Sequence, residues 1–318
     1  MKHAAHDLEQ MQGLPLAAKI IMTQQRIRQW YDYYEGDVYV CFSGGKDSTV
    51  LKHLVEHTSG VYDIPSVFVN TGLEFPEIRM FATSQSNVTV LRPEMRFDEV
   101  LKKYGYPVIG KQQARYIRDL QNANEKNMAT VNLRLTGYNR NGRYCPSMKL
   151  ADKWVYLKDA PFKISEQCCD VMKKAPMKKY QKETGRMPII GTMVCESALR
   201  RKAWLMNGCN AFDAKDPKSQ PMSFWTEQDV LQYISENNIP YCSVYGEIKQ
   251  DDNGEWYTTG EKRTGCMFCM FGCHLEESPN RFQRMKETHP RQYEYCMRSP
   301  KENGLGIGEI LDYMGINH

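Results

Sequence analysis

The 318-residue chain lacks any stretch that would place it in a membrane. It has no run of about 18 uncharged apolar residues, the length that a membrane-spanning helix needs. Its first residues, MKHAAHDLEQMQG, lack the apolar segment of a secretory signal. Internal repeats and low-complexity linkers are also missing, which argues against solenoid and fibrous architectures. We therefore expect a globular, cytoplasmic protein without a membrane partner.

A strong excess of charge of one sign is missing too. Lys and Arg number 42 against 38 Asp and Glu, and a net charge of +4 does not by itself indicate nucleic-acid binding. Cysteine, in contrast, is abundant, with eleven residues. Because disulfides are rare in a reducing compartment, these thiols are expected to serve burial, metal binding or chemistry. Four stand singly among apolar or small neighbours and are expected in the core: Cys41, Cys195, Cys209 and Cys242.

Short apolar runs alternate with segments of helical periodicity. Strands are expected at residues 37–42, 64–72, 88–93 and 186–193, and helices at 8–34, 48–57, 75–86, 111–124, 196–208 and 225–240. This alternation predicts an α/β fold with a doubly wound, mostly parallel sheet and helices on both faces. We expect it to fill one domain over residues 1–245, followed by a small cysteine-bearing extension over 246–318.

Two local signals are sharper than the rest. Thr226 followed by Asp229 predicts a capped start for the helix that stops before Pro240. Asn253-Gly254 predicts the turn of a polar hairpin. Residues 124–160 form a basic, tyrosine-bearing segment to which periodicity assigns no regular element.

The segment YVCFSGGKDSTVLKHLV, residues 39–55, places two glycines and a lysine between an expected strand and an expected helix. Such a turn aims backbone N–H groups and the helix dipole at one point, which binds an anion. The Walker pattern needs Ser or Thr directly after Gly-Lys, whereas Asp47 intervenes here and the four-residue spacer is missing. A P-loop kinase or GTPase is therefore disfavoured. Residues 70–72 stand at the carboxyl end of the next expected strand and belong to the same sheet edge.

SGGKDS after the first strand resembles the SGGxDS signature of the PP-loop nucleotide-binding family. The resemblance implies a loop that grips the pyrophosphate end of ATP. The implied phosphate cradle consists of Ser43, Gly44, Gly45, Ser48 and Thr49. Lys46 would neutralise the phosphates, and Asp47 would help to position Mg²⁺.

Further stretches resemble the phosphoadenosine phosphosulfate reductase family, and with the loop they span most of residues 15–245. They are NTGLEFPE (70–77), GTMVCESALRR (191–201) and WTEQDVLQYISENNIPY (225–241). The resemblance implies an adenosine site along Asn70, Thr71 and Gly72, and a phosphate-facing segment with Glu196, Ser197 and Arg200. Gly191 and Thr192 would also line the nucleotide site.

Two features of the 191–201 segment weaken the implied site assignments. Where the family often has Gly-x-Arg, this chain has Gly191-Thr192-Met193, so a sulfate-recognising arginine is missing from that position. Glu196 and Ser197 could instead be no more than helix-start residues.

Cysteines pair up at two distant places. Cys168 and Cys169 are adjacent, and Cys266 and Cys269 form a Cys-x-x-Cys hook that Cys273 follows. Four such thiolates could hold zinc or a four-iron four-sulfur cluster, and their spacing does not distinguish the two. The spacing is also compatible with a protein that binds no metal. The Cys-Cys plus Cys-x-x-Cys set resembles the cluster-binding adenylylsulfate reductases. That resemblance implies a 4Fe-4S cluster on Cys168, Cys169, Cys266 and Cys269, with Cys273 as an alternative fourth ligand.

Two enzymatic functions compete. Sulfonucleotide reductases of the family carry an attacking cysteine in a terminal Glu-Cys-Gly-Leu-His, whereas this chain ends LDYMGINH with no cysteine after Cys296. Reductases commonly have a changed loop, whereas Lys46 and Asp47 are intact and suit Mg-ATP. We therefore favour ATP-dependent adenylation with pyrophosphate release, coupled to sulfur transfer, with Lys46, Asp47 and Arg200 as catalytic residues. In this the chain resembles the iron-sulfur member of DNA phosphorothioation systems.

Two alternative functions stay open. The first is reduction of phosphoadenosine or adenosine phosphosulfate to sulfite, with Cys273 or Cys296 replacing the tail cysteine. The second is a noncatalytic nucleotide or nucleic-acid binding module. Its basic and aromatic surface would consist of Arg115, Arg118, Arg134, Arg140, Arg143, Tyr116, Tyr138 and Tyr144. An adenine nucleotide is the expected ligand, and DNA, RNA or a sulfur-donor protein are candidate partners.

Overall fold

A computed structural model describes residues 3–318, which divide into two compact units. Unit 1 comprises the chain up to Asn70 together with Glu74–Arg92 and Pro176–Thr264. Unit 2 comprises Thr71–Leu73, Pro93–Ala175 and Gly265–His318. The expected boundary at residue 245 does not coincide with this division, because residues 93–175 share a unit with the C-terminal segment.

The described part of unit 1 contains a six-stranded sheet in the order β3-β2-β1-β5-β7-β6. The strands are β1 (Val38–Cys41), β2 (Ser66–Val69), β3 (Val88–Leu91), β5 (Met187–Ile190), β6 (Asn210–Ala211) and β7 (Lys218–Ser219). Only the β6–β7 pair among them is antiparallel. The mostly parallel, doubly wound sheet that the sequence predicts is confirmed.

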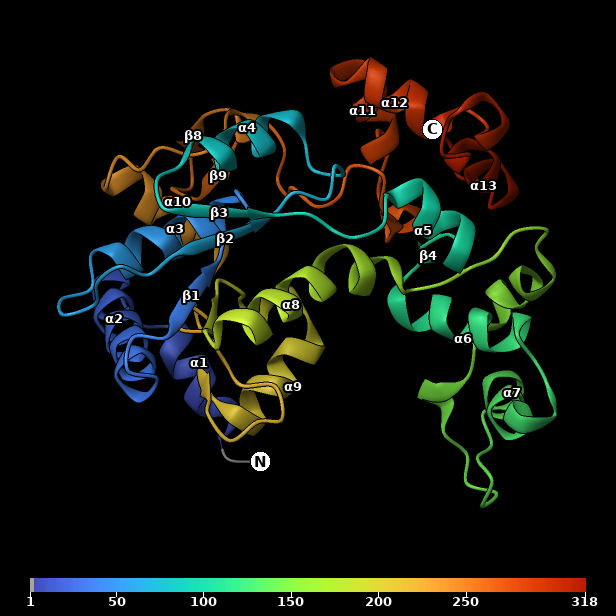
Figure 1. The fold of residues 1–318 in the computed structure, drawn as a ribbon, viewed down its shortest axis with the longest axis horizontal. Helices are drawn as coiled ribbons and strands as arrows, with labels where there is room; N and C mark the ends of the chain where they lie inside the picture. The colour runs from blue at the N-terminus through green and yellow to red at the C-terminus, as the bar shows by residue number, and fades with distance from the viewer. Residues whose placement is uncertain (1–2) are drawn as a thin grey trace. The chain divides into compact units, whose positions relative to one another are not determined.

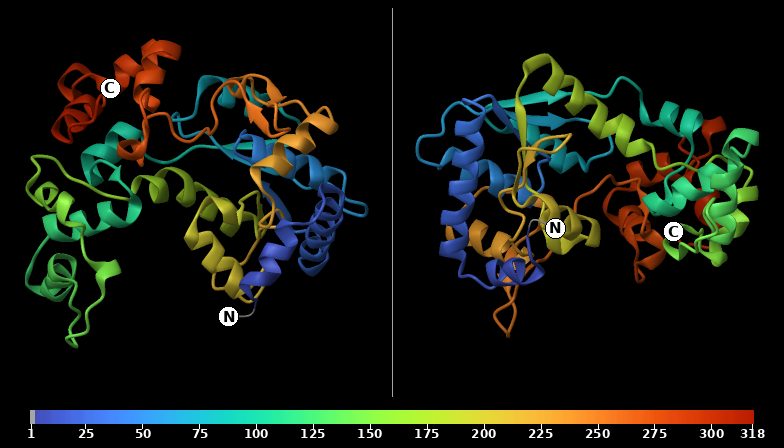
Figure 2. Two further views of the ribbon diagram at one scale, coloured as in Figure 1. Left: turned by 180° about the vertical axis from the view of Figure 1, so that it is seen from behind. Right: turned by 90° about the horizontal axis from the view of Figure 1, so that it is seen from below.

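Helices cover both faces of this sheet (Figures 1 and 2). They are α1 (Ala5–Gln12), α2 (Leu16–Tyr33), α3 (Lys46–Glu56), α4 (Pro76–Ser84), α8 (Ala175–Thr184), α9 (Ala198–Asn207) and α10 (Glu227–Glu236). Alternation along β1 decides which face each residue serves. Val38 and Val40 join the main core with Trp30 of α2, whereas Tyr39 points the other way and meets Tyr180 of α8, with ring centroids 5.1 Å apart.

Two details of unit 1 bear on the sequence signals. The helix expected over residues 8–34 is two helices, because Gly13 ends α1 and Pro15 precedes α2. The Thr226 hydroxyl accepts the Asp229 N–H at 3.3 Å, and the Asp229 carboxylate accepts the Thr226 N–H at 2.6 Å, so the predicted cap is confirmed. The predicted hairpin is β8 (Ile248–Gln250) paired with β9 (Trp256–Thr258).

Unit 2 is mainly helical. Its elements are α5 (Phe97–Tyr104), β4 (Val108–Ile109), α6 (Lys111–Gln121), α7 (Met128–Thr136), β10 (Met270–Phe271), α11 (Arg281–Thr288), α12 (Pro290–Met297) and α13 (Ile307–Tyr313). Parallel pairing of Met270 with Val108 joins the C-terminal segment to the middle of the chain. Residues 124–160, unassigned by periodicity, contain α7, two three-residue 3₁₀ turns and an eight-residue 3₁₀ segment, Asp152–Asp159. Within residues 3–318, no helix is long and apolar enough to cross a membrane.

Candidate functional site

The glycine-rich turn of unit 1 leads from β1 into the first turn of α3, as predicted. Gly44 has a φ of 74°, and a Cβ at this position would lie 3.0 Å from the Ile78 carbonyl oxygen and 3.1 Å from the Ala82 Cβ. The Ser48 hydroxyl donates to the Gly45 carbonyl at 2.9 Å and accepts the Ser43 N–H at 3.1 Å. These bonds hold the turn at the end of α3 where N–H groups lack intrahelical partners. The loop therefore has the geometry of an anion cradle.

Lys46 is the buried cation of this loop. Its ammonium donates to the Lys262 carbonyl at 2.7 Å, pairs with Glu227 at 2.9 Å and lies 5.2 Å from the centre of the Tyr245 ring. Its backbone N–H donates to the Tyr245 hydroxyl at 3.2 Å, and that hydroxyl contacts Thr264. Burial raises the pKa of Tyr245 to about 12, so the hydroxyl stays neutral. The sequence did not predict that Tyr245 and residues 262–264 pack against the loop, because no motif marks them.

Asp47 stands among several charges. Among the described residues, its Oδ1 atom is buried without a hydrogen-bond partner. Burial raises the pKa of this carboxyl, Lys46 opposes the rise, Glu227 adds to it, and Arg263 and Arg200 also oppose it. A carboxylate with an unsatisfied oxygen beside cationic groups suits a site that takes a phosphate together with its divalent cation.

The segment after β5 reaches the same loop. A Cβ on Gly191 would lie 3.1 Å from the Asp47 carbonyl oxygen, so glycine allows the close approach. Glu196 accepts the Met193 N–H at 3.0 Å and pairs with Arg200, whose pKa burial lowers. Ser197 caps α9 by accepting the Arg200 N–H at 3.3 Å. Glu196 and Ser197 therefore have helix-start roles in the structure.

The remaining predicted nucleotide residues divide between the units. Thr49 lies in α3, where its hydroxyl donates to the Gly45 carbonyl at 3.0 Å, and Thr192 accepts from Gln220. Asn70 follows β2, and its N–H donates to the Leu91 carbonyl at 2.9 Å. Thr71 and Gly72 belong to unit 2.

Cys195 is exposed, so its predicted place in the core is wrong. Cys195 lies in the 3₁₀ turn Val194–Glu196, which three residues separate from the end of β5, and not in a strand or helix of the core. Its Sγ lies 3.7 Å from the Trp225 carbonyl, and the charges of Asp47 and Arg263 act on it. An accessible thiol therefore lies near the loop. Cys209 and Cys242 are buried as predicted, and Cys41 is partly buried.

Unit 2 brings together the four cysteines predicted as metal ligands. Cys168, Cys169, Cys266 and Cys269 line one pocket, whose other walls are Leu73, Phe97, Pro107, Met172, Lys173 and Phe268. The adjacent pair sits at the start of the π-helical turn Asp170–Lys174, a distortion common at functional sites. Cys273 is also buried, but its thiol donates to the Met270 carbonyl at 3.0 Å and it does not line this pocket.

The thiols of the adjacent pair are in different electrostatic states. Their sulfur atoms lie 4.0 Å apart, and the Cys168 thiol donates to Cys169. This bond lowers the pKa of Cys169 and raises that of Cys168, while Lys111 and Lys173 further favour the Cys169 thiolate. Thiolate is the form that binds metals.

Donor chemistry tests which metal group fits. Within residues 3–318, no three His, Cys, Asp or Glu side chains converge closely enough to hold a single ion. A zinc ion needs such convergence, since it draws four ligands to about 2.3 Å from one point. A cubane cluster takes one thiolate at each of four irons, so its ligands surround a larger volume. Four cysteines around a mainly apolar pocket supply the number of thiolates that a four-thiolate metal centre needs.

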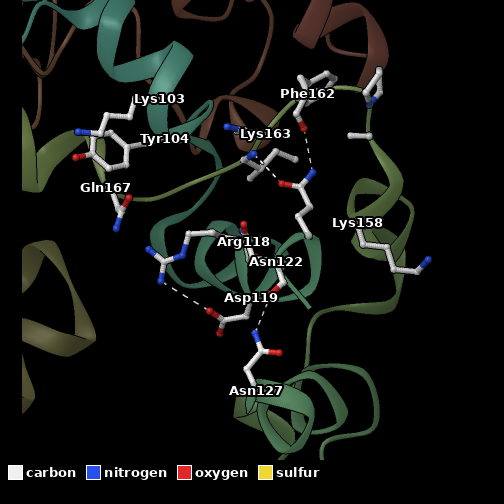
Figure 3. Close-up of a pocket in the computed structure, with 14 residues that line it drawn as sticks. Lys103, Tyr104, Arg118, Asp119, Asn122, Asn127, Lys158, Phe162, Lys163 and Gln167 are labelled. Carbon is white, nitrogen blue, oxygen red and sulfur yellow. Dashed lines mark hydrogen bonds and ion pairs between the residues drawn. The ribbon is translucent and has the colours of Figure 1, made fainter. Parts of the chain in front are cut away.

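A larger hollow of about 580 Å³ in unit 2 is lined by residues from α5, α6 and the 158–167 segment (Figure 3). Two of its cations are engaged by neighbouring carboxylates. Arg118 pairs with Glu166 at 2.8 Å, and Lys158 pairs with Asp159 at 2.5 Å. Gln121 fixes the wall by bonding the Phe162 carbonyl and the Ile164 N–H, both at 2.9 Å. We assign no ligand to this hollow.

The fold and the loop define a doubly wound α/β protein with an anion-binding turn at its first strand-helix junction. The phosphoadenosine phosphosulfate reductase domain matches residues 37–141 and 137–273. The match covers more than half of the chain, which therefore belongs to this family of enzymes. The chain is also similar to the crystal structure of phosphoadenylyl-sulfate (PAPS) reductase from Candida auris in its phosphate complex. That likeness has 14% identity and a TM-score of 0.39, and covers 80% of this chain and 98% of the other. No curated protein matches the chain.

Proposed function

We propose that this enzyme uses Mg-ATP to adenylate an oxygen of its acceptor, releasing pyrophosphate, and that a sulfur nucleophile then displaces AMP. One observation carries the proposal: Lys46 and Asp47 stand intact at the start of α3, with Arg200 and Arg263 acting on the same carboxylate. ATP presents β- and γ-phosphates that need such cations, whereas a sulfonucleotide does not.

The proposed reaction proceeds in two balanced steps. The acceptor oxygen attacks the α-phosphorus, the bond from that phosphorus to the bridging oxygen breaks, and pyrophosphate leaves with its electron pair. Sulfur then attacks the acceptor atom that bears the adenylated oxygen, the bond from that atom to the oxygen breaks, and AMP leaves with the oxygen. In both steps the loop acts by positioning and charge neutralisation, which dominate catalysis at phosphate.

Different residues of the chain would bind the pyrophosphate, neutralise it and position the metal ion. The Ser43–Ser48 turn and the α3 N-terminus would bind the pyrophosphate, Lys46 would neutralise it, and the unsatisfied Asp47 oxygen would orient Mg²⁺. We propose that Cys168, Cys169, Cys266 and Cys269 hold a 4Fe-4S cluster, with the Cys169 thiolate already favoured by Lys111 and Lys173. Such a cluster supplies one-electron and Lewis-acid chemistry when bound.

The loop part of the proposal is tested by Mg-ATP binding. Lys46→Ala and Asp47→Ala should each weaken binding by about 10- to 100-fold, since a charged hydrogen bond contributes roughly 1.5–3 kcal/mol. Isothermal titration calorimetry measures this. Lys52→Ala is the matched control, because Lys52 is a buried lysine of α3 that pairs with Glu56 beyond the loop. Unchanged affinity in both loop variants, or an equal loss in the control, contradicts the proposal.

The chemical step is tested by pyrophosphate release in the presence of candidate acceptors, against sulfite release from phosphoadenosine or adenosine phosphosulfate. Family membership and the exposed thiol of Cys195 favour the reductase as the second candidate. Cys273 and Cys296 are less accessible for replacing a tail cysteine, because both are buried, whereas burial raises the pKa of all three thiols. Sulfite production that Cys195→Ser abolishes would establish the reductase instead.

A further inference from the structure

From Lys126 to Ala151 the chain has no aspartate or glutamate but five lysines and arginines, Lys126 included. In the structure this stretch contains α7 and a hairpin over residues 138–144, which extends beyond α7 in Figures 1 and 2. The Asn139 side chain fixes the turn by accepting the N–H groups of Asn141 and Arg143, both at 3.0 Å. The hairpin is thus an ordered projection without negative charge of its own.

Two tyrosines pair across this hairpin. Tyr138 and Tyr144 form an antiparallel bridge, and their ring centroids lie 5.1 Å apart. They keep 54% and 52% of their surface exposed, although tyrosine can bury its ring against a protein core. Tyr144 is also held against Gly137, where a Cβ would lie 2.7 Å from its ring. Neighbouring rings held open to solvent form a platform on which flat ligands stack.

Four of the five arginines predicted for a basic surface fall into two groups. Arg134 is buried, pairs with Asp119 at 3.0 Å and lies 3.9 Å from the centre of the Tyr116 ring, so it holds α7 against α6. Arg118 is engaged by Glu166. Arg140 and Arg143 differ, because they are exposed beside the two open rings and, within residues 3–318, no carboxylate pairs with either.

We propose that the 138–144 hairpin binds single-stranded nucleic acid. Unstacked bases would lie on the rings of Tyr138 and Tyr144, while Arg140 and Arg143 pair with the adjacent phosphates. A duplex is disfavoured as the ligand, because its bases are already stacked on one another. DNA and RNA share this chemistry. Because the binding requires no ATP, its test is independent of the adenylation proposed above.

The test is fluorescence anisotropy with labelled oligothymidine and oligouridine of about 12 nucleotides, without ATP. Tyr138→Ala and Tyr144→Ala should each weaken binding by about 5- to 100-fold, since one stacked base contributes roughly 1–3 kcal/mol. Tyr138→Phe and Tyr144→Phe keep the rings and should bind like the unaltered protein. Tyr62→Ala is the control, because Tyr62 is a 69% exposed tyrosine of unit 1.

The salt dependence supplies a second readout that a loosened hairpin would not mimic. The double variant Arg140→Ala/Arg143→Ala should reduce the slope of log K against log salt by about 1.4, since each phosphate contact to a single strand contributes about 0.7. Stronger binding of one oligonucleotide identifies the preferred strand. The proposal is overturned if the unaltered protein binds neither strand. It is also overturned if a duplex or heparin binds as tightly as the single strands, or if the alanine variants bind normally.

Discussion

A single buried ion pair ties the first long helix of unit 1 to the capped helix α10. The Lys19 ammonium donates to both Asp229 carboxylate oxygens, at 2.8 and 2.7 Å, and both residues are buried. The same carboxylate also accepts from Thr226 at the start of α10. Asp229 therefore serves a helix cap and a long-range pair at once.

We expect Asp229→Ala to lower the free energy of unfolding by about 3–5 kcal/mol, because it leaves the Lys19 ammonium buried without a counter-charge. Urea denaturation followed by circular dichroism measures the loss. Asp32→Ala is the matched control, since Asp32 pairs with Arg28 of the same helix, α2, at the surface. That exposed pair should contribute at most about 1 kcal/mol. Equal losses in the two variants would show that burial of the Lys19 pair does not matter.

At the scale of elements, the turn between β1 and α3 depends on a glycine that meets two constraints. Gly44 has a positive φ and is also crowded by Ile78 and Ala82 of α4. Gly185 has a similar φ of 72°, but a Cβ there would meet nothing within 4 Å. Comparing substitutions at Gly44 and Gly185 therefore separates the cost of backbone strain from the cost of crowding.

Gly44→Ala should destabilise the protein by clearly more than Gly185→Ala, for which left-handed backbone alone costs about 1–2 kcal/mol. Thermal or urea unfolding gives both values. Because the crowded turn must shift, Gly44→Ala should also weaken Mg-ATP binding while Gly185→Ala leaves it unchanged. A Gly44→Ala variant with the stability and affinity of the control would show that α4 does not confine the turn.

The cysteine pocket is a further element whose parts can be tested one at a time. Protein prepared without oxygen should contain about four irons per chain with acid-labile sulfide. Cys168→Ser should lose iron, whereas Cys273→Ser should retain it, because the Cys273 thiol donates to Met270 and lies outside the pocket lining. Metal and sulfide analysis of the three proteins decides this. Stoichiometric zinc without sulfide, or iron loss only in Cys273→Ser, contradicts the ligand set.

At the scale of the molecule, unit 2 is built from segments far apart in the chain. Gly272 donates to the Ile109 carbonyl at 2.8 Å, and Tyr106 donates to the Leu305 carbonyl at 2.9 Å. Tyr313 packs against Phe162, with ring centroids 5.3 Å apart. Residues 265–318 therefore complete a core that residues 93–175 begin.

A chain ending at residue 245 should leave that core open, because it loses β10 and the helices that follow. We expect it to bind the dye ANS and to aggregate, and we expect the isolated 246–318 segment to be unfolded by circular dichroism. The full chain is the control for both. A 246–318 fragment with dispersed amide resonances would instead support an independent C-terminal domain.

The sequence was sufficient where the relevant interactions are local. Alternating apolar runs predict β1, β2, β3 and β5, and Thr226 with Asp229 predicts the start of α10, since neighbours in the chain supply these interactions. The SGGKDS turn is also local, so its place at the strand-helix junction is correctly predicted. The cluster and the ATP chemistry stay predictions.

Only the tertiary structure decided what distant segments do to one another. Tyr245 and Lys262 close on the loop, Cys195 is exposed, and residues 93–175 share a core with the C-terminal segment. The structure also divides the basic residues into internal pairs, such as Arg134 with Asp119, and the exposed arginines of the 138–144 hairpin. Periodicity records which side of an element is apolar, but it does not record which other element covers that side.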